Sequence, residues 1–266
     1  MESQNLAPGV LAIVSGEAIT LEDLPAYLKF RLQLRPTIIG LIRDRLVAKA
    51  CEALQIEADE DELDNYVDTF RENKKLFTVP ETTSWLANQD MTYDDLCCLC
   101  EWELKLGKLK ERIAEGQLEK SFAFRKLDLD GVELYRIVMP DEVQVMEILT
   151  LLNEGADFFG LARTYSEDQV TRLQCGYMGV VRRKELRPEV EACVFAAKEG
   201  SVAGPVRSLG DYHLYRVERF YPARLEGETR TLLLDEIFEQ WMQRQIAAAD
   251  IQLFTPTGSL QDDYND

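Results

Sequence analysis

The sequence predicts an α+β protein in which a small antiparallel sheet domain, flanked by helices, is inserted into an all-helical domain. Three observations support this prediction. Residues 20–124 show nearly continuous helical periodicity, and two strand-like apolar runs, residues 133–139 and 213–220, enclose a mixed segment. Amphipathic helical periodicity then returns over residues 226–248. The helical domain is therefore expected to be built from both ends of the chain.

Domain boundaries follow from composition and from the two terminal apolar runs. A turn-rich stretch at residues 126–131 separates the helices from the mixed segment. Val10–Val14 and residues 251–254 are predicted to be short strands. We expect these two strands to pair, which would bring the C-terminal helix back to the N-terminal helices. The predicted segments are 1–127 (helical), 128–222 (sheet domain), 223–254 (returning helix and strand) and 255–266 (disordered acidic tail).

Start and stop signals place the N-terminal helices. Thr20 opens the first, which runs to about Leu34 before Pro36 interrupts it, and the second covers residues 37–54. The third begins at Asp59, and a short fourth begins at Pro80. A long fifth helix begins at the cap Thr92 and continues to about Phe124.

The mixed segment alternates strands and helices. After the strand at 133–139, helices are expected at 141–153 and 158–166, followed by a long loop with a Gly-rich turn at 176–179. A further helix at 188–197 precedes two strands, residues 204–208 and 213–220. This order predicts a small antiparallel sheet with helices on its faces.

Charge and hydropathy exclude two classes of partner. With 30 basic and 48 acidic residues the net charge is −18, so the surface repels nucleic acid and anionic membranes. No run approaches the ~20 apolar residues that span a bilayer, which predicts no membrane insertion. The first nine residues lack the basic start and apolar core of a secretory signal, so we expect a cytoplasmic protein.

The cysteine pattern predicts free thiols. Cys97, Cys98 and Cys100 crowd on one helix, where a regular disulfide framework is impossible and a reducing compartment fits better. A zinc site would need more ligands than the sole histidine, His213, supplies. No phosphate-binding loop is present either, so no metal and no cofactor are expected.

The sheet segment resembles the parvulin-type peptidyl-prolyl cis-trans isomerase (rotamase) domain. Five pieces carry the resemblance by their order and spacing: G-A-D-F-F-G-L-A-R-T-Y-S-E-D (155–168), G-Y-M-G (176–179), L-R-P-E-V-E-A-C-V-F (186–195), E-G-S-V-A-G-P-V (199–206) and D-Y-H-L-Y-R-V (211–217). The flanks V-L-A-I-V-S-G-E-A-I-T-L-E-D-L (10–24) and A-L-Q-I-E-A-D-E-D-E-L (53–63) resemble the helical chaperone region of SurA-like foldases. In those proteins the C-terminal helix rejoins the N-terminal ones.

The resemblance implies a set of site residues. It implies catalytic roles for Asp168, beside the substrate carbonyl, and for Ser208 and His213 beneath the proline pocket. Leu186 and Val190 would line that pocket. Met178 and Arg136 complete the implied substrate-binding set.

Several positions depart from the family pattern. Arg136 stands where the family keeps the first of two histidines, and Val190 replaces a pocket Phe. Cys175 replaces a Gly, Tyr177 an Asp and Asp211 a Gly. Without the resemblance, Asp168 reads as a solvated or capping carboxylate, His213 as a satisfied half-buried residue, and Leu186 and Val190 as core.

Two functions follow from the resemblance. The first is a foldase that isomerises Xaa-Pro bonds in an unfolded or extended polypeptide. The second is a SurA-like holdase, or a secretion or maturation accessory protein, with a catalytically silent isomerase domain. Extended-peptide binding needs exposed apolar and aromatic surface, and the candidates are Tyr27, Phe30, Tyr66, Phe70, Trp85, Trp102 and Trp241, most of which are expected to pack internally.

Overall fold

Two compact units divide the chain. The computed structural model describes residues 9–255 and 258–259. One unit comprises Met1–Glu115 with Glu236–Asp266, and the other comprises Gly116–Asp235. The first unit is thus discontinuous in sequence, and the division falls within helix α10 (Gly227–Ala248). The predicted fold class, a helical domain with an inserted sheet domain, is confirmed.

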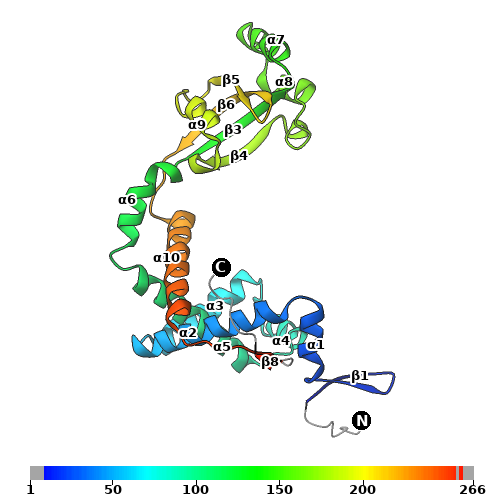
Figure 1. Cartoon of the computed structure of the whole chain (residues 1–266), viewed down its shortest axis with the longest axis vertical. Coiled ribbons are helices and arrows are strands. Elements are labelled where there is room, and N and C mark those ends of the chain that lie inside the picture. Colours follow the sequence, from blue (N-terminus) through cyan, green and yellow to red (C-terminus); the bar gives the residue numbers. More distant parts are fainter. Residues whose placement is uncertain (1–8, 256–257, 260–266) are drawn as a thin grey trace. The chain divides into compact units, whose positions relative to one another are not determined.

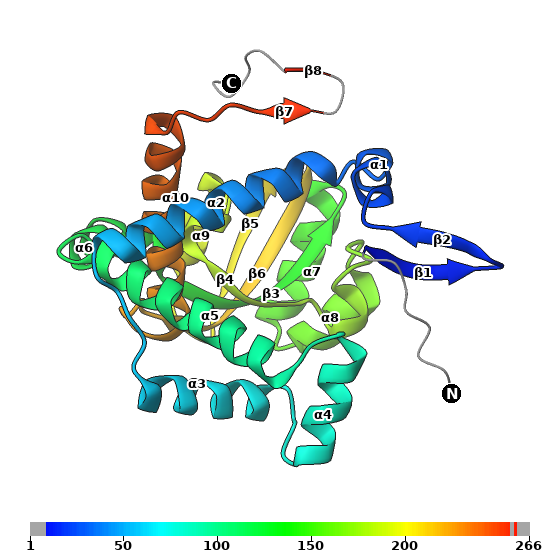
Figure 2. The same ribbon diagram turned by 90° about the horizontal axis from the view of Figure 1, so that it is seen from below.

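The first unit is a helical domain with two apolar clusters. Its helices besides α10 are α1 (Asp23–Phe30), α2 (Leu34–Ala53), α3 (Glu60–Asn73), α4 (Val79–Asn88) and α5 (Tyr93–Ala114). Figure 2 shows α5 running between α2 and α3. Val47 and Leu109 of α2 and α5 pack with Phe238 and Met242 of α10, so the C-terminal helix returns to the N-terminal helices as predicted. The second cluster joins α3, α4 and α5.

The predicted starts at Asp59 and Thr92 are confirmed, whereas the N-cap of α1 is Glu22 and not the predicted Thr20, and α4 begins one residue before the predicted Pro80. Asp59, Thr78 and Thr92 each form a capping box, in which the cap side chain accepts from the third helical N–H and the third side chain accepts in return. These reciprocal bonds satisfy backbone donors that the first helical turn would otherwise leave free. No helix among the described residues is long and apolar enough to cross a membrane.

The expected pairing of the two terminal strands is wrong. β1 (Val10–Val14) pairs instead with β2 (Glu17–Thr20), a strand that the sequence reading missed. The turn between them has positive φ at both Ser15 and Gly16, the conformation that a two-residue hairpin requires. Local pairing also closes a much shorter loop than pairing across the whole chain.

The C-terminal tail is described only in part. β7 (Phe254–Thr255) pairs with β8 (Gly258–Ser259), so the last strand begins three residues later than predicted. The rest of the predicted tail at 255–266 lies outside the described residues.

The predicted long fifth helix is two helices. α5 ends at Ala114, and α6 (Leu118–Leu129) begins after a short break and runs through the expected turn-rich junction. Gly116 in the break has φ of +72°, a left-handed conformation that ends a right-handed helix and that glycine adopts without strain.

A four-stranded antiparallel sheet organises the second unit. Its strands are ordered β4-β3-β6-β5, with bounds β3 (Gly131–Met139), β4 (Tyr177–Arg182), β5 (Val202–Ser208) and β6 (Asp211–Tyr221) (Figure 1). The Gly-rich segment at 176–179, expected as a turn, in fact leads into the edge strand β4. The accompanying helices are α7 (Glu142–Asn153), α8 (Phe158–Tyr165) and α9 (Pro188–Phe195), with short 3-10 helices η1 (Arg172–Gln174) and η2 (Arg183–Glu185).

Each face of this sheet has its own apolar cluster. Ile137 and Leu214 pack with α7 and α8 on one face. Leu134 and Val217, which alternate with them along β3 and β6, pack with Val190 and Val194 of α9 on the other. Because successive strand residues point to opposite faces, the sheet becomes the middle layer between α9 and the α7–α8 pair.

Replacing a buried residue of the helical unit tests its core. Leu109 is fully buried in the cluster formed by α2, α5 and α10, so Leu109→Ala should lower the free energy of unfolding by about 2–5 kcal/mol. Leu41→Ala, at a residue of α2 that is 64% exposed, should change it by less than about 0.5 kcal/mol. Urea denaturation followed by circular dichroism measures both, and equal losses would contradict the assignment of this core.

Candidate active site

Strand register brings the candidate residues to one face of the sheet. In the antiparallel β3–β6 ladder, Arg136 lies opposite Tyr215, and Val138 lies opposite His213. Cross-strand partners share a face, and Tyr215 packs in the cluster that includes Val190 of α9. Arg136 and His213 therefore lie on the α9 face.

Asp168 and Arg136 form an ion pair. Nε and one terminal nitrogen of Arg136 donate to Asp168 Oδ2 at 3.2 and 2.6 Å, and Thr171 Oγ1 donates to the same oxygen. The side chain of Asp168 is 10% exposed and that of Arg136 is 25% exposed. The candidate catalytic carboxylate and the residue at the missing histidine position are thus direct partners.

The surroundings of Asp168 keep it ionised. Burial alone would raise the pKa of Asp168, but the hydrogen bonds from Thr171 and Arg136 and the Arg136 charge outweigh burial and lower it. The N–H of Val170 also donates to Asp168 Oδ1, at 3.2 Å. A carboxylate that accepts several donors favours its charged form.

A glycine next to this pair permits close backbone contact. Arg136 N donates to Gly176 O at 2.7 Å. Gly176 has φ of +88°, and a Cβ added there would collide with the carbonyl oxygen of Arg136. The preceding Cys175 also has positive φ, 56°. Cys175 and Gly176 therefore form a tight bend that connects η1 to strand β4.

His213 is buried and hydrogen-bonded at both ring nitrogens. Nε2 lies 3.0 Å from the carbonyl oxygen of Ser208, and Nδ1 lies 3.3 Å from the hydroxyl of Tyr215. Burial lowers the pKa of His213, and the nearby charge of Arg136 lowers it further. The histidine is therefore neutral at pH 7.

A tight hairpin places Ser208 next to His213. Leu209 and Gly210, both with positive φ, form the two-residue turn between β5 and β6. The buried Ser208 donates from Oγ to Glu189 Oε1 at 2.7 Å, and this bond is the main cause of the lowered pKa of Glu189. The hydrogen-bonded chain thus runs from Tyr215 through His213 and Ser208 to α9.

The candidate pocket residues share one apolar cluster. Met178 and Leu186 are half-buried against the cluster that contains Val190. Val190 itself is only 3% exposed. Leu186 and Met178 thus keep exposed apolar surface, whereas Val190, which was predicted to line the pocket, is almost wholly covered.

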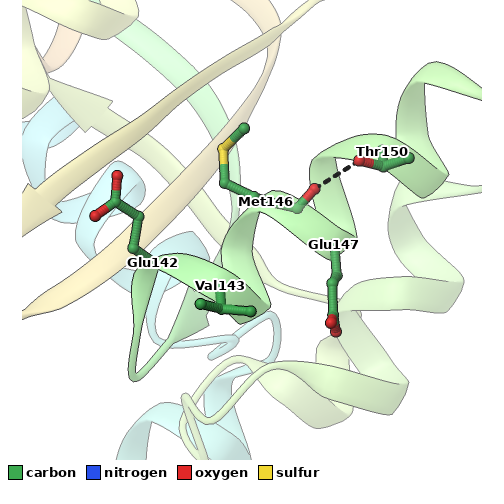
Figure 3. Close-up of a pocket in the computed structure, with 5 residues that line it drawn as sticks. All are labelled: Glu142, Val143, Met146, Glu147 and Thr150. Atoms are coloured by element: carbon green, nitrogen blue, oxygen red, sulfur yellow. Dashed lines mark hydrogen bonds between the residues drawn. The ribbon is translucent and has the colours of Figure 1, made fainter.

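The residues that line three surface hollows of this unit do not include Asp168, Ser208 or His213. The first, about 460 Å³, lies on the outer face of α7, where Figure 3 shows Val143 beside Met146. Another, about 320 Å³, is lined by Leu186 together with Arg183, Pro188 and residues near the end of α6. The third, about 170 Å³, lies around Phe195 and Phe220.

The structure brings the predicted residues together and adds partners that sequence reasoning missed. Asp168, Arg136, His213 and Ser208 are linked by direct contacts or by the β3–β6 register. The added residues are Tyr215, Glu189 and Thr171. Only Tyr215 had a sequence signal, because residues i and i+2 of a strand share a face.

The sheet unit matches a known family model. Residues 141–219 match the PPIC-type PPIASE domain, Rotamase. Foldase protein PrsA of Caldanaerobacter subterraneus is 28% identical over 150 residues, 54% of this chain and 49% of that protein. Chaperone SurA of Pectobacterium atrosepticum is 23% identical over 199 residues, 66% of this chain and 46% of that protein. The chain spans about half the length of these curated relatives.

A solved structure is similar over more of the chain. The peptidylprolyl isomerase PrsA of Bacillus anthracis aligns with 82% of this chain and 100% of its own, at 19% identity and a TM-score of 0.44.

Arg136 lies before the residues that match the family model, whereas Asp168, Ser208 and His213 lie within them.

Substituting Gly176 tests the close contact with Arg136. Gly176→Ala should destabilise the protein by about 1–3 kcal/mol more than Gly179→Ala. Both glycines have positive φ, so both variants share a conformational penalty of about 1–2 kcal/mol. A Cβ at Gly179 would meet nothing within 4 Å, so only Gly176→Ala adds a collision. Thermal unfolding measures the difference, and equal effects would contradict the contact.

The ionised state of Asp168 predicts a pH dependence of stability. Its pKa is lower in the folded protein than in the unfolded chain, where it is about 3.9. The carboxylate therefore contributes stability above about pH 4, and this contribution is lost as pH falls through the folded pKa. Urea unfolding between pH 2 and pH 7 should show Asp168→Asn less stable than the parent at pH 7 and converging with it in acid. A constant gap would contradict an ionised Asp168.

Proposed function

We propose, from the premise that residues 141–219 form a PPIC-type parvulin domain homologous to PrsA foldases and SurA chaperones, that the chain is a foldase. It would act as a peptidyl-prolyl cis-trans isomerase on Xaa-Pro bonds of unfolded or extended polypeptides. The observation that carries the proposal is the gathering of Asp168, Arg136, Ser208 and His213 on the sheet face that also holds the candidate pocket residues.

The chemistry of the bond sets what the site must do. Amide resonance gives an Xaa-Pro bond a rotation barrier of about 20 kcal/mol. The planar amide carries partial negative charge on oxygen, and the twisted transition state carries less. A site accelerates rotation when it favours the twisted form over the planar one, and it needs no covalent step.

Asp168 supplies the electrostatic part of this mechanism. An anionic carboxylate beside the substrate carbonyl disfavours the negative oxygen of the planar amide. Arg136 keeps Asp168 ionised but also offsets part of its field, because opposite charges 2.6 Å apart act together as a dipole. We therefore expect an isomerase whose rate depends on the charge of Asp168, with an electrostatic effect that Arg136 reduces.

The remaining residues hold the substrate and order the site. Leu186 and Met178, half-buried against Val190, offer an apolar contact for the proline ring. His213 and Ser208 form a hydrogen-bonded chain beneath it that ends at Glu189. Ser208 and His213 are buried, and satisfied buried polar groups are rigid, which favours a fixed geometry for the bound peptide.

A specific observation favours holdase activity as a second candidate function. Phe30 is 84% exposed and Leu32 is 86% exposed, and Tyr27 of α1 is also exposed. Exposed apolar side chains of this size attract extended peptides. The other aromatic candidates pack internally, as expected: Tyr66, Phe70, Trp85, Trp102 and Trp241.

We also propose that the protein works in a reducing compartment such as the cytoplasm. Its six cysteines are all free thiols. Burial raises the pKa of Cys100 to about 11 and also raises the pKa of Cys51, Cys97 and Cys193. Such thiols are protonated and unreactive at pH 7.

Peptide turnover tests the isomerase. Asp168→Asn should lower kcat/KM for short Xaa-Pro peptides by about 10-fold or more, equivalent to about 1.4 kcal/mol of transition-state stabilisation. Exchange NMR on cis and trans signals measures the rate without a coupled protease. Glu154→Gln, which neutralises an exposed carboxylate at the end of α7, should leave the rate unchanged.

The same experiment separates the two candidate functions. Loss of turnover in Asp168→Asn with the fold retained supports the enzyme. A parent without turnover that still suppresses aggregation of an unfolded client, and loses this effect in Phe30→Ser, supports the holdase instead.

A further inference from the structure

The hydrogen bonds of His213 define its tautomer. A carbonyl oxygen can only accept, so the ring nitrogen that contacts Ser208 O, Nε2, must carry a proton. In the neutral ring the other nitrogen, Nδ1, is then an acceptor. The Tyr215 hydroxyl lies 3.3 Å from Nδ1 and is the donor to it.

The placement of Tyr215 follows from strand geometry. Residues 213 and 215 lie two apart in β6 and therefore point to the same face. Their rings are nearly parallel, with centroids 5.9 Å apart and an angle of 13° between planes. Both side chains are buried, so water does not compete readily for Nδ1 and the tyrosine hydroxyl is its partner.

Burial is the main reason that the ring is neutral, and the charges around it act in both directions. Burial raises the pKa of Tyr215, which keeps its hydroxyl protonated, and the positive charge of Arg136, which lies opposite Tyr215 on β3, only partly opposes this. Burial lowers the pKa of His213, and Arg136 acts in the same direction. Asp211 on β6 and Asp168 after α8 raise the pKa of His213, but burial and Arg136 prevail. Glu189 on α9 is the remaining acidic neighbour, held by Ser208.

We propose that Tyr215 is a positioning residue that holds His213 as the neutral Nε2–H tautomer, so that His213 serves as a fixed donor to the Ser208 carbonyl. The significance of this role rests on the proposed isomerase function. The resemblance places the first of two histidines where this chain has Arg136, and His213 matches the other. In this chain Arg136 bonds Asp168, and Tyr215 supplies the hydrogen bond to the remaining histidine.

His213 is the sole histidine, so one set of imidazole signals reports the arrangement. In the parent labelled with ¹⁵N-histidine, we expect a protonated Nε2 and an unprotonated Nδ1 from pH 7 down to below the ordinary histidine pKa, about 6.5. A protonated Nδ1 in the neutral parent, or a ring that titrates at the ordinary value, would overturn the proposal without any variant.

Tyr215→Phe tests the hydroxyl directly. Removing the donor to Nδ1 should raise the pKa of His213, because that donor stabilises only the neutral ring, and should let the two tautomers mix. Tyr135→Phe is the matched control, since Tyr135 lies in the same sheet and packs on the opposite face against Phe159. Unchanged signals and titration in a folded Tyr215→Phe would overturn the proposal.

Turnover separates failure of this inference from failure of the proposed function. In an active parent, Tyr215→Phe should lower kcat/KM by about 2- to 12-fold, the effect of one lost hydrogen bond, and Tyr135→Phe should not lower it. An inactive parent with the expected histidine signals would contradict the isomerase and leave the tautomer assignment standing. An active parent whose Tyr215→Phe variant keeps full activity would refute the positioning role.

Discussion

The antiparallel register between β3 and β6 is the constraint on which the candidate site depends. It sets Arg136 against Tyr215 and Val138 against His213, and it assigns these side chains to the α9 face. A slip of one residue would send every side chain of a strand to the opposite face. Leu134 and Ile137 would then exchange layers, so the two apolar clusters that stabilise the sheet also hold the polar site in place.

The side chain at the centre of the candidate site is positive, opposite in sign to the net charge of the chain. A protein with a net charge of −18 uses a single arginine at the centre of its candidate site. Burial lowers the pKa of His213 and Arg136 adds to this by repulsion, whereas the hydrogen bonds from Thr171 and Arg136 and the Arg136 charge lower the pKa of Asp168 against its burial. A histidine at this position would not carry a permanent charge. Arginine in place of the family's histidine therefore changes the protonation states that the site favours as well as its shape.

Sequence periodicity and family resemblance predicted much of the fold and most of the site. The fold class, the caps at Asp59 and Thr92, and the two central strands could be read directly, because each depends on local signals. Strand β4 and the break at Gly116 escaped, since glycine marks turns, bulges and helix ends alike. Glu189 escaped because its contact with Ser208 depends on how α9 packs, which no local pattern encodes. The pairing of Asp168 with Arg136, 32 residues away, likewise needed coordinates.

The hydrogen bonds of the site differ widely in the length of chain that they close. His213 reaches Ser208 across five residues and Tyr215 across two, so this half is complete once a single hairpin has formed. The ion pair closes a loop of 32 residues that contains two helices. Since the entropy of closing a flexible loop grows only slowly with its length, insertions between β3 and Asp168 are inexpensive. Insertions in the Leu209–Gly210 turn would instead break the hydrogen bond between His213 and Ser208. Relatives should therefore differ in length between β3 and Asp168 and keep the length of the turn between β5 and β6.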